Sequence, residues 1–195
     1  MEGSAMQEAK VKSPEDRKVL DRLLEERWLS GLWNVQAEER PLDPKTTVKP
    51  HIWKWKDVYD GLLLAREAIG IKSGTVERRN IRLVNPGLQD RKLTTHTMLF
   101  GFQLIQPGEV APAHRHTMTA IRFVLKGKGA YTNVEGKKMI MEAGDLILTP
   151  QWTWHEHANG SAKDEAILFS MHDTPVLQAF GLYREEGQGD SHIGL

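Results

Sequence analysis

From Met98 to Met171 the chain is a series of short β-prone runs separated by turns that contain Gly or Pro, and this pattern constrains the fold most. The turns include Pro107-Gly108, Gly127–Gly129 and Gly144-Asp145. The runs between them are only about three to eight residues long, too short for a helix of ordinary length. Evenly spaced short strands with turn signals between them are typical of an all-β barrel or sandwich. The runs are Met98–Ile105, Ile121–Leu125, Ala130–Val134, Lys138–Met141, Leu146–Leu148 and Ala166–Met171.

The segment before the barrel has helical patterning. Ser13-Pro14-Glu15-Asp16 combines an N-cap hydroxyl, a Pro at the first helical position and acids in the first turn, which predicts a helix that ends near Gly31. A second amphipathic stretch runs from Asp57 to Ile69, and Arg79–Val84 is predicted to be a short strand.

These patterns divide the chain into three parts. We expect an N-terminal helical arm with a lead-in strand over residues 1–90, a β-barrel over 91–183 and a polar C-terminal tail over 184–195. The arm is rich in Trp and Leu and needs a surface to pack against. We therefore expect a homo-oligomer, although the arm could also cover its own barrel.

The charge balance and the cysteine count exclude several classes of function. Lys plus Arg and Asp plus Glu are both 26, so the chain lacks the basic excess that is typical of nucleic-acid-binding domains. The longest apolar run, Met98–Ile105, is far too short to cross a bilayer, and the N-terminus has no signal-peptide pattern. Without Cys there is neither a disulfide framework nor a thiolate site. We expect a soluble, cytoplasmic protein that binds neither nucleic acid nor membrane.

Two histidine pairs stand out in the barrel segment. His114-Arg115-His116 places two imidazoles two residues apart, and His155-Glu156-His157 repeats the arrangement. On a strand, residues two apart point to the same face, so two such strands could bring several imidazoles to one point inside a barrel. Loop histidines beside Pro112 are the alternative.

The residues around these pairs resemble the two motifs of the cupin superfamily. Gly108, His114-x-His116 and Gly127 are similar to the first motif, and Gly144, Pro150, His155 and Asn159 are similar to the second. The resemblance implies a jelly-roll β-barrel with a metal held by His114, His116 and His155. Most cupins add a Glu that is separated from the second His by three or four residues, but Ala120 and Ile121 occupy those positions here.

Three neutral imidazoles suit Fe, Zn, Cu and Ni alike, so the ligands alone do not name the metal. Leaving out the carboxylate preserves the full charge of a divalent ion, which favours an anionic chelating substrate. An octahedral ion would keep three positions for such a substrate and O2, whereas tetrahedral Zn with a bound water is the competing interpretation.

The stretch from Pro107 to Asn159 resembles more closely the gentisate 1,2-dioxygenase and salicylate dioxygenase branch of the cupins. The resemblance extends upstream through Pro50–Trp55, Glu77–Arg79 and Asn85–Leu88. It implies an Fe(II) cofactor, with Zn, Mn or Ni as alternatives. It also implies ring cleavage, with O2, of an aromatic acid that bears adjacent carboxylate and hydroxyl groups, of the gentisate, salicylate or hydroxynaphthoate type.

Four further residues are candidates for the site. Arg122 lies an even number of residues from His116, so an unbroken strand would aim it into the same interior, where a guanidinium could grip a substrate carboxylate. The resemblance adds Gln103 as a substrate-binding residue. Arg79 is a further substrate-binding candidate, and His157 is a candidate catalytic acid or base. The alternatives are a surface ion pair for Arg122, a core-edge hydrogen bond for Gln103 and a loop-capping role for His157; Arg78 competes with Arg79.

Two departures from the branch leave other functions open. Its members usually carry two cupin domains in a longer chain, and their active barrel usually carries an Asp where this chain has Ser170. His172, two residues further on, is a candidate to take that place. The alternatives are an O2-independent metal-dependent lyase, isomerase or hydrolase, and a non-catalytic barrel that binds aromatic acids.

Overall fold

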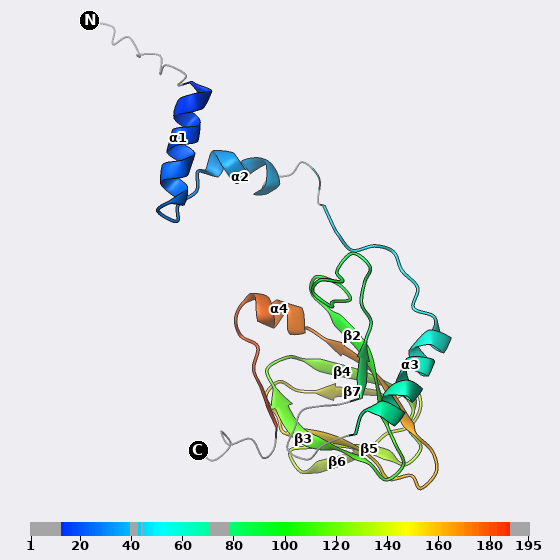
Figure 1. The fold of residues 1–195 in the computed structure, drawn as a ribbon. Helices are drawn as coiled ribbons and strands as arrows, with labels where there is room; N and C mark the ends of the chain where they lie inside the picture. The colour runs from blue at the N-terminus through cyan, green and yellow to red at the C-terminus, as the bar shows by residue number, and fades with distance from the viewer. Residues whose placement is uncertain (1–12, 40–42, 44, 71–78, 188–195) are drawn as a thin grey trace, which may run out of the picture. The chain divides into compact units, whose positions relative to one another are not determined.

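The computed structural model describes residues 13–39, 43, 45–70 and 79–187 (Figure 1). The chain divides into two compact units, residues 1–46 and 47–195. Residues 1–12 of the expected N-terminal arm lie outside the described residues, as does Arg78. None of the helices within the described part of the chain has the length and apolar character needed to span a membrane.

The first unit contains two helices, α1 (Pro14–Glu25) and α2 (Leu32–Glu39). The predicted start of α1 is confirmed: the Ser13 hydroxyl accepts from the Asp16 N–H, and the Asp16 carboxylate accepts from the Ser13 N–H. The predicted end near Gly31 is wrong, because α1 ends at Glu25 and a separate helix follows. The Asp21 carboxylate joins the two helices by accepting from Trp33 and Asn34.

The second unit is built on two five-stranded antiparallel sheets. The first sheet has the order β1-β2-β9-β4-β7, and the second has the order β10-β3-β8-β5-β6 (Figure 1). The strands are β1 (Asn80–Arg82), β2 (Leu99–Ile105), β3 (Val110–His116), β4 (Ala120–Lys126), β5 (Ala130–Val134), β6 (Lys137–Ile140), β7 (Leu146–Thr149), β8 (His155–Asn159), β9 (Ala166–His172) and β10 (Glu185–Gly187). Two helices accompany them, α3 (Trp55–Ala68) and α4 (Thr174–Ala179). The expected all-β fold is confirmed.

Apolar side chains from both sheets fill one end of the space between them. Strand alternation sends one set of side chains inward, so that Ile105, Val124 and Leu168 of the first sheet meet Ala130 of the second. All four are fully buried. The functional groups described below must therefore use the remainder of the interior.

Helix α3 covers the outer face of the first sheet over β2 and β9. Its buried residues Val58 and Leu62 pack with Leu104 of β2 and Ile167 of β9. Adjacent residues of β9 thus serve two different cores: Ile167 faces the helix, whereas Leu168 faces the barrel interior. This alternation fixes which β9 side chains point inward.

The motif glycines occupy turns that another residue would strain. Gly108, before β3, has φ +73°, and Gly144, before β7, has φ +98°. Both values lie in the left-handed region that L side chains rarely adopt. The two glycines therefore fix the turns that lead into β3, which carries two of the histidines, and into β7 of the opposite sheet.

The C-terminal segment expected as a tail contributes a strand. Glu185–Gly187 form β10, which pairs with His114–His116 of β3, and residues 188–195 lie outside the described part. Sequence patterning missed this strand because its partner lies about seventy residues earlier and because Glu and Gly are poor strand formers.

Candidate metal centre

Three histidines converge from two neighbouring strands of the second sheet. His114 and His116 lie two apart on β3, so both point to the interior, and His155 at the start of β8 is directly opposite His114. Their exposed fractions are 5%, 0% and 1%. A register shift on β3 between Ala111 and His114 locally alters the pairing just before the first histidine.

The three rings are arranged as a ligand set. The candidate ligand nitrogens all lie within 4.8 Å of one another. Ring centroids are separated by 4.2 Å for His114–His155, 4.7 Å for His116–His155 and 5.3 Å for His114–His116. Among the described residues, the cluster contains no carboxylate.

Backbone carbonyls orient two of the imidazoles. His116 Nδ1 lies 2.9 Å from the Met118 carbonyl, and His155 Nδ1 lies 2.9 Å from the Thr153 carbonyl. A carbonyl only accepts, so Nδ1 carries the proton and donates, and Nε2 keeps its lone pair. His116 Nε2 is buried without a hydrogen-bond partner in the described structure. A metal ion would satisfy this atom, so the residues present fit a metal site.

The electrostatics keep His116 neutral. Burial, followed by the positive charge of Arg122, lowers the pKa of His116 to about 4. At neutral pH the ring is therefore an imidazole, the form that binds metals. Ala120 lies on the inner face of β4 and Ile121 is 38% exposed on the outer face, so neither replaces the Glu of other cupins.

Arg122 reaches the interior by a different route from the one expected. The prediction assumed one strand from His116 to Arg122, but β3 ends at His116 and β4, in the other sheet, begins at Ala120. The inward orientation is nevertheless found: Arg122 is 4% exposed, and its Nη1 donates to the Thr149 hydroxyl at 3.0 Å.

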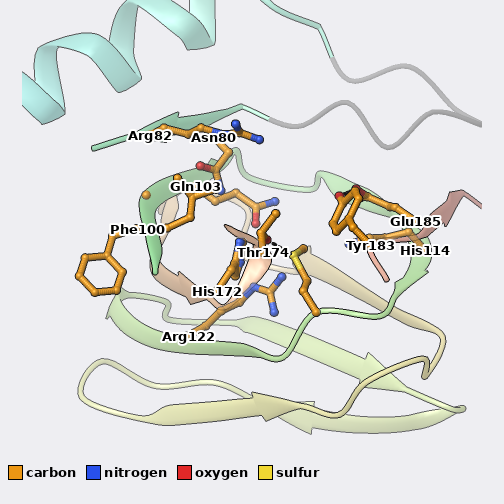
Figure 2. Close-up of a pocket in the computed structure, with 13 residues that line it drawn as sticks. Asn80, Arg82, Phe100, Gln103, His114, Arg122, His172, Thr174, Tyr183 and Glu185 are labelled. Carbon is orange, nitrogen blue, oxygen red and sulfur yellow. Dashed lines mark hydrogen bonds between the residues drawn. The ribbon is translucent and has the colours of Figure 1, made fainter. Parts of the chain in front are cut away.

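A cavity of about 370 Å³ joins Arg122 to the histidine cluster. Figure 2 shows Gln103, Arg122 and His172 projecting toward its middle, with Arg82 on one side and Tyr183, Glu185 and His114 on another. The lining residues are Asn80, Arg82, Leu99, Phe100, Gly101, Gln103, His114, Met118, Arg122, His172, Thr174, Tyr183 and Glu185. A space of this size, with Arg82 and Arg122 in its lining, is within the range of small-molecule binding sites.

The C-terminal strand supplies part of the cavity that sequence reasoning missed. Tyr183 and Glu185, which hydrogen-bond to each other, line it beside His114. Arg115, between the two ligand histidines, points outward; it stacks over Trp152 and Trp154 at 4.4 and 4.9 Å from their ring centroids.

The structure places Arg79 away from the cavity. Its guanidinium is 2% exposed, forms an ion pair with Glu109 and donates to the Ile69 carbonyl at 3.1 Å. This position differs from the substrate-binding role expected from the sequence. Arg82, three residues later on β1, lines the cavity instead.

His157 lies beside the cluster rather than in the cavity lining. It is 1% exposed, its ring centroid is 5.7 Å from that of His155, and its Nδ1 contacts the Thr132 hydroxyl. Its expected role as an acid or base therefore stays a prediction. Gln103, by contrast, is 2% exposed and faces the cavity from β2.

Comparison with known proteins adds an independent line of evidence. A family model described as a cupin domain matches residues 101–172. The gentisate 1,2-dioxygenase 1 of Aquipseudomonas alcaligenes is 39% identical over 90% of this chain and 50% of its own length. The 1-hydroxy-2-naphthoate 1,2-dioxygenase of Nocardioides sp. strain KP7 is 42% identical over 87% of this chain and 44% of its own.

One relative has a length closer to that of this chain. The 5-nitrosalicylic acid 1,2-dioxygenase of Bradyrhizobium sp. is 32% identical over 74% of this chain and 70% of its own length. Among solved structures, a salicylate 1,2-dioxygenase from Pseudoaminobacter salicylatoxidans with gentisate superposes with a TM-score of 0.82 and 34% identity, over 95% of this chain and 50% of that one. The chain spans about half the length of most of the relatives it matches.

Proposed function

This chain belongs to the gentisate and salicylate 1,2-dioxygenase branch of the cupin family, and we propose that it cleaves the ring of a hydroxylated aromatic carboxylate with O2. The observation that carries the proposal is the single cavity lined by both Arg122 and His114. Such a cavity lets one molecule meet a fixed cation and a metal site at the same time.

We propose iron(II) as the metal, held by His114, His116 and His155. Neutral imidazoles bind this ion well, and the relatives named above are dioxygenases. Bound iron(II) would supply the coordination positions and the electrons that activate O2 for insertion into the ring. Zn, Mn and Ni remain the alternatives that metal analysis of the purified protein would distinguish.

The side chains of this chain would bind and orient the substrate. The Arg122 guanidinium presents a planar fork that suits a carboxylate, and its hydrogen bond to Thr149 limits the orientations it can take. The Gln103 amide faces the same cavity and would hydrogen-bond the substrate. Because the ligand histidines are almost fully buried, a bound aromatic acid would exclude water from the centre.

His157 is proposed as the acid-base group. It lies next to His155, and its Nδ1 contact with Thr132 fixes the ring so that a proton could be held at the other nitrogen. The pH–rate profile of a His157→Gln variant tests this role: a merely structural residue would change the rate at all pH values without moving the profile.

The substrate class follows from the same groups. In an aromatic acid whose carboxylate lies beside a hydroxyl, the carboxylate can bind Arg122, and one oxygen from each of the two groups can bind the metal. Gentisate, salicylate and 1-hydroxy-2-naphthoate all have this arrangement. Relatives named for gentisate, 5-aminosalicylate and hydroxynaphthoate are all found among the matches. This range of names supports the class rather than one member of it.

Oxygen uptake by protein reconstituted anaerobically with Fe(II) tests the proposal. We expect substrate-dependent O2 consumption and a ring-opened product with at least one of these acids. His114→Ala should abolish both, whereas the exposed His96, changed to Ala, should have no effect. Turnover without O2, or binding without a product while metal is bound, would overturn the proposal.

We also propose that the protein self-associates through the outer face of β4 and β7. Ile121, Phe123, Leu146 and Leu148 are between 37% and 67% exposed there, where α3 leaves the first sheet uncovered. Light scattering after gel filtration tests this, and a monomer would contradict it.

The cytoplasmic location stays a prediction.

A further inference from the structure

Among the described residues that line the cavity, only Met118 carries a sulfur atom. Met118 lies in the loop that joins β3 to β4. Its side chain is 7% exposed, and it shares the cavity with His114 and Arg122. Methionine thioethers are common targets of oxidants in proteins. An oxidant formed at the metal site would therefore reach this sulfur without leaving the cavity.

The contact that Met118 makes with Thr174 favours its oxidised form. The Thr174 hydroxyl donates to Met118 Sδ at 2.7 Å, and Thr174 is only 5% exposed. A thioether sulfur is a weak acceptor, so this buried donor has a poor partner. A sulfoxide oxygen at the same place would be a polar acceptor in reach of the same hydroxyl. The surroundings would thus stabilise the sulfoxide rather than expel it.

The backbone of the same residue holds a metal ligand. The Met118 carbonyl accepts from His116 Nδ1 at 2.9 Å, and the N–H of the next residue, Thr119, donates to the Asp173 carboxylate at 2.8 Å. The loop is therefore fixed against the start of α4 through Thr174 and Asp173. An oxygen added to the Met118 side chain would need space in this packed contact, and the carbonyl that orients His116 would shift with it.

We propose that Met118 is the residue that this metal centre oxidises in itself, and that its sulfoxide weakens metal binding. The inference rests on the proposed function for the presence of iron and O2. It assigns a modification site that lies outside the metal ligands. The result is a brake: a centre that reduces O2 without a substrate loses its metal.

The oxidant is hydrogen peroxide, which forms when O2 takes up two electrons and two protons with no aromatic acid present. A reductant such as ascorbate supplies the electrons. The Met118 sulfur attacks one peroxide oxygen, the O–O bond breaks and an S–O bond forms. The second oxygen takes the remaining proton of the first and leaves as water. Two electrons pass from sulfur to peroxide, and the thioether becomes the sulfoxide.

Peptide mass spectrometry locates the oxidised methionines. Iron-loaded protein is kept in air with ascorbate, without any aromatic acid, and with catalase to remove peroxide that escapes. Met118 should become the sulfoxide severalfold faster than Met98 and Met139, although both of these are more exposed. In metal-free protein treated with added peroxide the order should reverse, because accessibility then decides. Oxidation of Met118 no faster than that of Met98 and Met139 in the iron-loaded protein would overturn the proposal.

Competition with a chromophoric chelator for Zn(II), a metal that does not react with O2, measures the effect on the ligands. Protein with Met118 oxidised should bind Zn(II) about tenfold more weakly than untreated protein. Met118→Leu, which has no sulfur to oxidise at this position, should keep its own untreated affinity after the same treatment. Met118→Gln places an amide oxygen there and should show the loss without oxidation. Unchanged affinity in the oxidised wild-type protein would overturn the proposed brake.

These experiments separate the inference from the proposed function, because neither uses an aromatic acid. If Met118 is oxidised and metal affinity falls but no ring is cleaved, only the proposed reaction fails. If a ring is cleaved but Met118 stays reduced in iron-loaded protein, this inference fails and the proposed reaction stands.

Discussion

Replacing Arg122 tests the substrate grip on which the proposed reaction depends. Arg122→Met keeps an unbranched apolar stem but removes the guanidinium that is held against Thr149 in the cavity. A guanidinium that grips a carboxylate makes two charge-assisted hydrogen bonds, each contributing about 1.5–3 kcal/mol. The variant should therefore lose about 3 kcal/mol or more of substrate binding, which corresponds to about 150-fold in kcat/KM.

The lysine variant separates charge from shape. Arg122→Lys retains the positive charge but not the planar fork, so its loss should be intermediate, on the order of tenfold. The assays are kcat/KM from oxygen uptake and the Kd of the substrate measured anaerobically. Arg91→Met, at an exposed arginine outside the cavity lining, is the matched control. An Arg122→Met protein that remains folded and stays within twofold of wild type in both quantities would refute the carboxylate grip.

Three other predictions concern the metal, the core and the C-terminal strand. His116→Ala should reduce bound metal, measured by elemental analysis, from about one ion per chain to near zero. Equal metal content in both proteins would contradict the ligand role. In wild-type protein, metal at a hundredfold excess over its Kd should increase the free energy of unfolding by about 2.7 kcal/mol. Leu62→Ala should lower the free energy of unfolding of the second unit by about 2–5 kcal/mol in denaturant, because Leu62 is fully buried where α3 packs on β2. A loss below about 1 kcal/mol would argue against that packing. A hydrogen bond from Arg115, together with the charges of Arg115 and Arg184, holds the pKa of Glu186 below its ordinary value near 4.5. The ionised Glu186 therefore stabilises the fold above pH 4.5, and this stabilisation is lost as the pH falls through the lowered pKa. Glu186→Gln should therefore be less sensitive to acid than wild type in melting curves between neutral pH and about pH 2, and parallel curves would contradict this.

Local patterns predicted the parts of the site that depend on strand alternation. His114 and His116 share a face because they are two residues apart on β3. Arg122 also points inward, but it lies on β4 of the other sheet, so the unbroken strand that the prediction assumed is not the reason. The position of His155 next to His114 could be predicted only by pairing the two motifs, which are about forty residues apart in the sequence. The family resemblance supplied that pairing, and the register of β3 with β8 places the two histidines opposite each other.

Residues whose position depends on distant partners could not be read from the sequence. Arg79 pairs with Glu109, thirty residues away, and this ion pair keeps it out of the cavity. Arg82 lines the cavity because β1 pairs with β2, and Glu185 does so because β10 pairs with β3. Neither strand pairing leaves a local periodic signal, since β1 and β10 are only three residues long.

Isotope labelling tests the central claim most directly. Fe(II)-loaded protein is mixed with gentisate under ¹⁸O₂, and the product is analysed by mass spectrometry. If the chain is a ring-cleaving dioxygenase whose metal is held by His114, His116 and His155, both labelled atoms should enter one ring-opened product. The His114→Ala variant should give no labelled product. Product formed without label, or formed equally under argon, would contradict the account.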